Sequence, residues 1–219
     1  MRLSLVGTVH TDSGLANAAE LQAIIERLNP DVIFAEVPSA SIDQYVDGSR
    51  GTIESAAVAR YREGRELAVI PVDLPEPDAE FFRTAKDMFR VVERTSHDYR
   101  RLVDRHAADT RTDGFAYLNS ERCIHAWSAI HKEVLATLDW IRQPRFHEVY
   151  ARWCSRNEHR DTAIVGNIAE YAHRHGFIRG LLLVGAAHRK SVGEKARARM
   201  AADQPQLEWQ LENPFESTE

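Results

Sequence analysis

Three short apolar segments occupy the first third of the chain, and polar residues, glycine or proline separate them. They span residues 3–7, 32–37 and 67–73, and their β-branched and aromatic content is typical of strands buried on both faces of a sheet. Between the first two, apolar residues at 18–28 recur every three or four positions, which predicts a helix. An alanine-rich segment at 53–64 predicts a second helix. The pattern therefore indicates a β-α-β-α-β unit with parallel strands and right-handed crossovers.

The strand pattern disappears from about residue 76 to residue 155, where apolar residues follow helical spacings. Residues 164–175 then follow a helical period, residues 180–185 form another buried apolar segment, and residues 207–212 alternate as in a half-exposed edge strand. We expect one α/β domain over residues 1–219, with a mostly parallel open sheet, flanking helices and a helical insertion at 76–155. We expect the strand order to be about 3-2-1-4, with the insertion covering the strand ends as a lid.

Composition and charge restrict the possible partners and compartments. The net charge is −5 and no segment is strongly basic, which argues against a protein that binds nucleic acid by neutralising phosphates. The two cysteines, Cys123 and Cys154, suit a reducing compartment better than a disulfide framework. The opening apolar run is too short for a signal peptide, and no apolar stretch approaches the ~18 residues that would span a bilayer. We therefore expect a cytoplasmic protein without a nucleic-acid or membrane partner.

Two copies of a Gly-x-x-His pattern each follow a predicted buried strand directly. The first runs from Gly7 to His10 and the second from Gly185 to His188. Ligands of open α/β sheets bind at the carboxyl ends of the strands, where the strand order reverses. In the order 3-2-1-4 the two loops flank that point, and neighbouring strands lie only ~4.8 Å apart. We therefore expect both imidazoles to face one cavity, with the two glycines among the residues of the cleft.

Two carboxylates are expected at the same edge. Glu36 ends the second predicted strand and Asp73 the third. A carboxylate beside a buried apolar run is costly unless it is paired, which makes Glu36 a candidate for the site. Asp73 is a further cleft candidate, although it is also well placed to cap the helix that follows it.

A charged segment at 156–161 is expected to begin the helix ahead of the last buried strand. A helix N-terminus carries about half a positive charge, so Arg156 is unfavourable there unless an anion compensates it. We therefore predict that Arg156 points into the cleft between His10 and His188. There it would orient Glu36 through a bidentate contact, or bind a substrate carboxylate or a developing oxyanion. Arg160 is a further candidate for the cleft.

These features together resemble a known family. The matching segments are residues 5–10, residues 30–36, the Arg156-Asn157 pair and residues 183–188. They are similar to the TraB/GumN/TIKI group within the erythromycin-esterase and ChaN-like superfamily. The resemblance implies a hydrolase, which in the TIKI branch is a metal-dependent protease and in the esterase branch opens a macrolide lactone. Other relatives bind haem.

Two chemical readings of the predicted site remain open. His10, Glu36 and His188 are a plausible ligand set for a divalent metal ion, which lowers the pKa of bound water toward ~7. Without a metal, either histidine takes a proton from water directly, with Glu36 fixing its tautomer. Both readings predict hydrolysis of an ester or amide bond in a peptide or small molecule. The alternative is a non-catalytic ligand-binding or regulatory module for haem or another tetrapyrrole, with Tyr45 or Tyr61 as an axial ligand.

Overall fold

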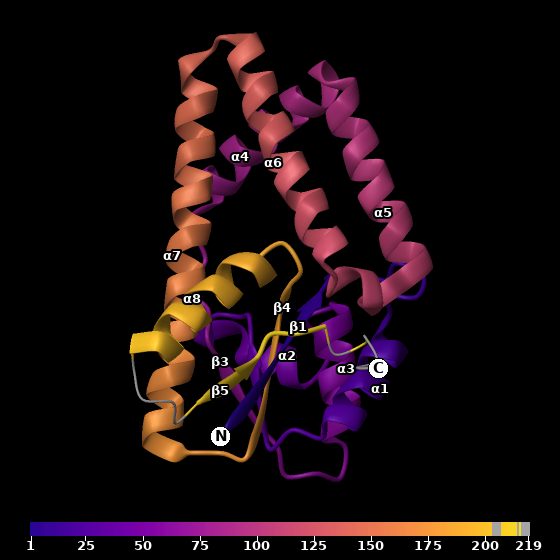
Figure 1. Ribbon diagram of the computed structural model, residues 1–219, viewed down its shortest axis with the longest axis vertical. Coiled ribbons are helices and arrows are strands. Elements are labelled where there is room, and N and C mark those ends of the chain that lie inside the picture. Colours follow the sequence, from indigo (N-terminus) through magenta and orange to yellow (C-terminus); the bar gives the residue numbers. More distant parts are fainter. Residues whose placement is uncertain (203–206, 214, 216–219) are drawn as a thin grey trace.

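A parallel five-stranded sheet forms the base of the protein, with helices on both of its faces (Figure 1). The computed structural model describes residues 1–202, 207–213 and 215. The parallel sheet with helices on both faces confirms the expected α/β class. The strands lie in the order β3-β2-β4-β1-β5. Their bounds are β1 (Arg2–Thr8), β2 (Val32–Ala35), β3 (Ala68–Pro71), β4 (Arg179–Gly185) and β5 (Glu208–Gln210).

The expected strand order is wrong at one position, because β4 lies between β2 and β1 instead of beyond β1. Leu182 is in register with Leu5 of β1 and with Phe34 of β2. The central position suits β4, since four consecutive leucine and valine residues, 181–184, are buried on both faces of the sheet. β4, which leads to His188, therefore lies between β1, which leads to His10, and β2, which leads to Glu36. The predicted edge strand at 207–212 is confirmed as β5.

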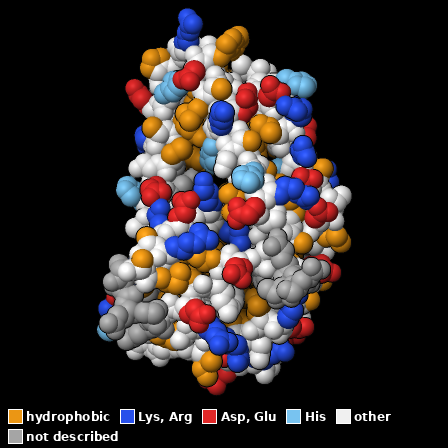
Figure 2. All heavy atoms as spheres, viewed as in Figure 1, with side chains coloured by type: hydrophobic (Ala, Val, Ile, Leu, Met, Phe, Trp, Pro, Cys, Tyr) orange, Lys and Arg blue, Asp and Glu red, His pale blue; other side chains and the backbone are white. Residues whose placement is uncertain are grey.

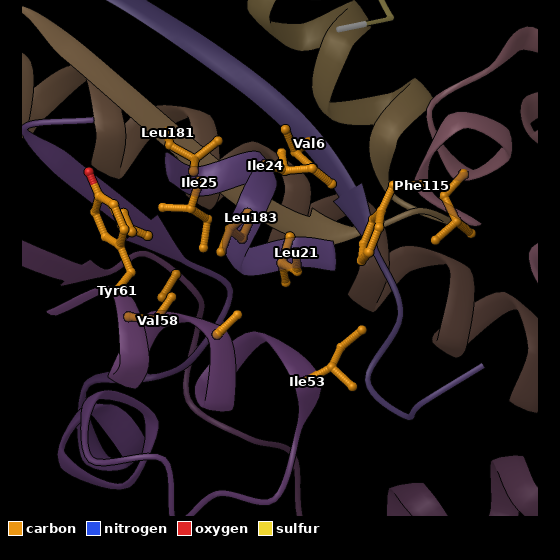
Figure 3. Close-up of a cluster of buried hydrophobic side chains, with 14 of the residues drawn as sticks. Val6, Leu21, Ile24, Ile25, Ile53, Val58, Tyr61, Phe115, Leu181 and Leu183 are labelled. Atoms are coloured by element: carbon orange, nitrogen blue, oxygen red, sulfur yellow. The ribbon is translucent and has the colours of Figure 1, made fainter. Parts of the chain in front are cut away.

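Helices cover the two faces of the sheet with separate apolar cores. On one face lie α1 (Ala18–Leu28), the short η1 (Ser39–Ser41) and α2 (Ile42–Val46), and α3 (Ile53–Arg62). Figure 3 shows part of this core, in which Leu21 and Ile25 of α1 lie close to Leu181 and Leu183 of β4. The other face is covered by α8 (Arg189–Ala202) and by the second half of α7 (Pro144–His175).

A helical layer rises from the carboxyl ends of the strands (Figure 1). It consists of α4 (Ala79–Thr95), α5 (His97–Leu118), α6 (Glu121–Ile141) and the first half of α7, and it has its own core around Met88, Leu138 and Tyr150. The helical character predicted for residues 76–155 is confirmed. No helix in the described ranges is long and apolar enough to cross a membrane.

The helix expected to begin at Arg156 in fact begins at Pro144 and continues without interruption to His175. Proline is favourable at the first helical position, because the N–H that it lacks has no partner within the helix. Neither proline nor glycine occurs between residues 145 and 165, so nothing in this range interrupts the helix. Arg156 is therefore in the middle of α7. The argument that placed it at a positive helix end is wrong.

Contacts from the helical layer hold the loop that follows β1. The side chain of Asn119, which is 1% exposed, accepts a hydrogen bond from Gly7 N at 2.7 Å and donates one to Gly7 O at 3.1 Å. Farther along the loop, Leu15 N donates to Arg111 O at 3.0 Å. Gly114 makes this close approach possible, because its φ is +55° and a Cβ there would lie 2.8 Å from Leu15 O. The segment carrying His10 is thus held at one end by Asn119, which caps the C-terminus of α5, and at the other by α5 itself.

Candidate functional site

A cavity of about 350 Å³ opens where the helical layer meets the carboxyl edge of the sheet. The strand ends contribute His10, Glu36 and Asp73, the start of α3 contributes Glu54, and α7 contributes Arg156 and Arg160. Figure 2 shows that one face of the protein mixes charges of both signs and carries no extended basic field. The cavity therefore lies where the sequence predicted a cleft.

His10 is oriented by Glu54, a residue that the sequence analysis missed. The Nδ1 atom of His10 lies 3.0 Å from Glu54 Oε1, which also accepts a hydrogen bond from Thr8 Oγ1 at 2.8 Å. Thr52 caps α3 by accepting from Ser55 N, which places Glu54 in the first turn of the helix. A carboxylate there is usual because it suits the helix dipole, so its position in the sequence gives no signal of function.

The contact between His10 and Glu54 also sets the protonation of the imidazole. The hydrogen bond and the negative charge of Glu54 raise the pKa of His10, and burial only partly opposes them. The His10 side chain is 65% exposed while that of Glu54 is 6% exposed. The carboxylate is therefore hidden behind the imidazole, and Nε2 of the ring remains available on the open side.

Glu36 is held by Arg160, although the sequence analysis assigned this role to Arg156. Arg160 Nη2 donates to Glu36 Oε1 at 2.7 Å, and Arg160 also binds both carboxylate oxygens of Asp73 through Nε and Nη2. The other oxygen of Glu36 accepts from Gly185 N at 2.6 Å. The side chains of Glu36 and Asp73 are 7% and 8% exposed, so one guanidinium compensates two buried carboxylates.

His188 lies behind Glu36 and is not among the described residues that line the cavity. Its Nδ1 is 2.7 Å from Asp161 Oδ1, and its Nε2 is 3.6 Å from Glu36 Oε1. Burial lowers the pKa of His188, but the Asp161 hydrogen bond and the charge of Glu36 outweigh this effect and the pKa is raised. The sequence analysis did not identify Asp161 as a partner of His188.

The side chains of Glu36 and His188, with the hydrogen bonds that they make in this structure, do not fit the role of metal ligands. A ligand histidine must be neutral, whereas His188 is surrounded by groups that favour its protonated form. Both oxygens of Glu36 already accept hydrogen bonds, one of them from a guanidinium. In the part of the chain that the structure describes, no three His, Cys, Asp or Glu side chains are grouped as metal ligands. The assignment of His10, Glu36 and His188 as ligands stays a prediction.

The two tyrosines considered as haem ligands lie in different places. Tyr61 is 2% exposed and donates a hydrogen bond to Asn29 Oδ1 at 3.3 Å, outside the cavity. Tyr45 lines the cavity and is 3% exposed. Haem requires an apolar slot beside its axial ligand, whereas this end of the cavity carries Glu36, Glu54 and Arg50. Of the two tyrosines, Tyr45 therefore remains as the candidate axial ligand of the haem alternative.

The remaining candidates lie in different places, and the two glycines predicted for the cleft are not among the described residues that line the cavity. Gly7 leaves room for its neighbours, because a Cβ there would lie 3.2 Å from Leu118 O and 3.3 Å from Ala186 Cα. Gly185 contributes its backbone N–H to Glu36. Arg156 lines the cavity as predicted, but its Nη2 donates to the carbonyl of Pro75 and not to Glu36.

The predicted site is thus assembled in part: His10, Glu36, Asp73, Arg156 and Arg160 line one cavity. Comparison with known proteins gives no assignment, since no family model, curated protein or solved structure matches the chain. The resemblance to the TraB/GumN/TIKI group therefore stays a prediction.

Proposed function

We propose that this protein is a hydrolase that cleaves an ester or amide bond, with His10 as the general base. The observation that carries the proposal is the pairing of His10 Nδ1 with Glu54 Oε1 at 3.0 Å beside a cavity. Glu54 is itself held by Thr8 and has little freedom to move. A carboxylate in this position holds an imidazole in the tautomer whose Nε2 accepts a proton.

The reaction begins with His10 neutral and its Nδ1–H donated to Glu54. Nε2 takes a proton from water as the water oxygen attacks the substrate carbonyl carbon, and an oxyanion forms. The imidazolium of His10 is stabilised by Glu54, and it then gives its proton to the leaving alcohol or amine. The carbon–leaving-group bond breaks as the carbonyl re-forms, so the products are a carboxylic acid and an alcohol or amine.

We assign the stabilisation of the oxyanion to Tyr45, which lines the cavity. Its hydroxyl has no hydrogen-bond partner among the described residues, and Ser55 Oγ donates to Tyr45 O at 2.9 Å, which ties α2 to the start of α3 beside Glu54. Burial, followed by the charges of Glu54 and Glu36, raises the pKa of Tyr45 well above its ordinary value. The hydroxyl therefore keeps its proton and acts as a donor.

Replacing Tyr45 by Phe is expected to lower kcat about 10- to 100-fold with little change in KM. A hydrogen bond to a charged group contributes about 1.5–3 kcal/mol, and this bond forms mainly with the oxyanion. Steady-state kinetics on an activated ester measures the change. Tyr171→Phe, on the opposite face of the sheet, is the matched control. Equal kcat in the wild type and Tyr45→Phe would remove Tyr45 from the mechanism.

Replacing Glu54 by Gln is expected to shift the acid limb of the pH profile of kcat/KM to lower pH. Glu54 raises the pKa of His10, so wild-type activity should appear as pH rises through a value above the ordinary ~6.5 of histidine. Without the carboxylate, His10 loses its proton at lower pH. The exposed Glu63 provides the control Glu63→Gln. An unmoved acid limb in Glu54→Gln would show that another group is the base.

The direct test is hydrolysis of chromogenic esters and amides by the purified protein, with and without a chelator. Activity that survives the chelator supports general-base catalysis by His10. Activity that requires added metal would support His10, Glu36 and His188 as metal ligands. It would overturn the metal-independent mechanism with His10 as the general base. Absence of turnover together with a Soret band in the purified protein would favour the non-catalytic haem alternative.

A further inference from the structure

One face of α7 lines the cavity with side chains that the hydrolytic steps do not use. Trp153, Arg156, Asn157 and Arg160 follow one another at spacings of three, one and three residues, so they lie along the same side of the helix. Arg160 is occupied by Glu36 and Asp73. Trp153, Arg156 and Asn157 form the rest of this face and extend away from the catalytic pair.

Arg156 is the cation of the cavity without a carboxylate partner among the described residues. Arg50 pairs with Glu76 at 3.3 Å, and Arg160 pairs with both Glu36 and Asp73. Among the described residues, the guanidinium of Arg156 hydrogen-bonds only to the Pro75 carbonyl, and its buried Nε has no acceptor. Donors are therefore left over on a positively charged group at the cavity wall, and an anion would satisfy them.

Asn157 adds a second polar group beside Arg156. The described residues supply no hydrogen-bond partner for its side-chain amide, although the residue is partly buried and lines the cavity. An amide can donate to a carboxylate oxygen or accept from a substrate N–H. Two adjacent residues of one helix thus present unused donors to the same space.

The wall next to these donors is apolar. Phe81 and Phe82 at the start of α4 contact each other edge to face, with ring centroids 5.7 Å apart, and both line the cavity with Trp153. Phe82 remains 51% exposed, so its ring still has apolar surface that a ligand could remove from water. This part of the cavity therefore suits an apolar group attached to an anion.

We propose that the cavity recognises a small carboxylate with an apolar arm, which binds Arg156 and Asn157 while the arm packs on Phe82 and Trp153. As a statement about substrate, the inference rests on the proposed hydrolytic function. A single uncompensated cation matches the single charge of a carboxylate better than the double charge of a phosphate. The volume of about 350 Å³ is at the lower end for small-molecule sites, which favours a small ester or amide over a folded protein substrate.

Calorimetry with 3-phenylpropanoate and the neutral 3-phenylpropanol tests this inference, because neither probe can be hydrolysed. The wild type is expected to bind the carboxylate at least tenfold more tightly than the alcohol, as a charge-assisted hydrogen bond predicts. Arg156→Gln should abolish this preference, and Arg156→Lys should keep part of it. Arg152→Gln, one turn earlier on the exposed side of α7, should bind as the wild type does. Equal affinities for the two probes, or no binding of either, would overturn the inference.

A second variant keeps the test valid if Arg156→Gln folds poorly. Phe82→Ala alters a half-exposed ring and should weaken both probes by a similar factor, because it removes apolar contact and leaves the charge in place. Unchanged binding of both probes would place the arm elsewhere and contradict the proposal.

The inference and the proposed function can fail separately. His10→Ala should keep the carboxylate preference while kcat/KM for hydrolysis falls about 10³-fold. Carboxylate binding without turnover of any ester or amide would refute the hydrolase and leave the binding site standing. Turnover that is indifferent to a carboxylate on the substrate and to Arg156→Gln would refute the binding site alone.

Discussion

Replacing His10 by Ala is expected to lower kcat/KM for ester hydrolysis about 10³-fold, within the range that general-base catalysis contributes. The imidazole is paired with a buried carboxylate and is open to the cavity. Removing it leaves attacking water without a base, while Tyr45 can still stabilise the oxyanion. Initial rates on an activated ester, measured above the pKa of His10, show the effect.

Stability should change little in His10→Ala, because the side chain is 65% exposed. The exposed His125 on α6 provides the matched control His125→Ala, which should keep wild-type rates. If both variants hydrolyse the ester as fast as the wild type, His10 is a surface residue and the proposed function is wrong.

Replacing Arg160 by Met is expected to lower the free energy of unfolding by about 3 kcal/mol, since removing one member of a buried ion pair strands its partners. Arg160 is the guanidinium that holds both Glu36 and Asp73, whose side chains are 7% and 8% exposed. Their negative charges would then lie close together, and among the described residues the remaining ion-pair partner is His188, which faces Glu36. Urea denaturation followed by circular dichroism measures the loss.

The surface control for this variant is Arg152→Met, which should change the free energy of unfolding by less than about 0.5 kcal/mol. The double variant Arg160→Met/Asp73→Asn should recover part of the stability, because one of the two stranded charges is removed. An unfolding free energy of Arg160→Met equal to that of the wild type would show that the cluster contributes nothing to the fold.

Local patterns were sufficient for the individual elements. The apolar segments at 3–7, 32–37 and 180–185 are strands because their side chains avoid water on both sheet faces, and alternation alone identified the edge strand at 207–212. Helical spacing likewise identified the layer at 76–155. The carboxyl ends of parallel strands share one edge, so His10 and Glu36 could be placed beside the same cleft without any structure.

The tertiary structure decided which charges meet in that cleft. The order of β4 and β1 depends on contacts between segments more than 100 residues apart, for which the sequence carries no local signal. α7 begins at Pro144, so Arg156 lies within the helix, and the packing of α7 on the sheet brings Arg160 and not Arg156 onto Glu36. The partners Glu54 and Asp161 look like ordinary helix residues in the sequence, and they became recognisable only when packing placed their carboxylates against His10 and His188. Sequence periodicity thus determines which face of an element is buried, whereas long-range packing determines the side chains that this face meets.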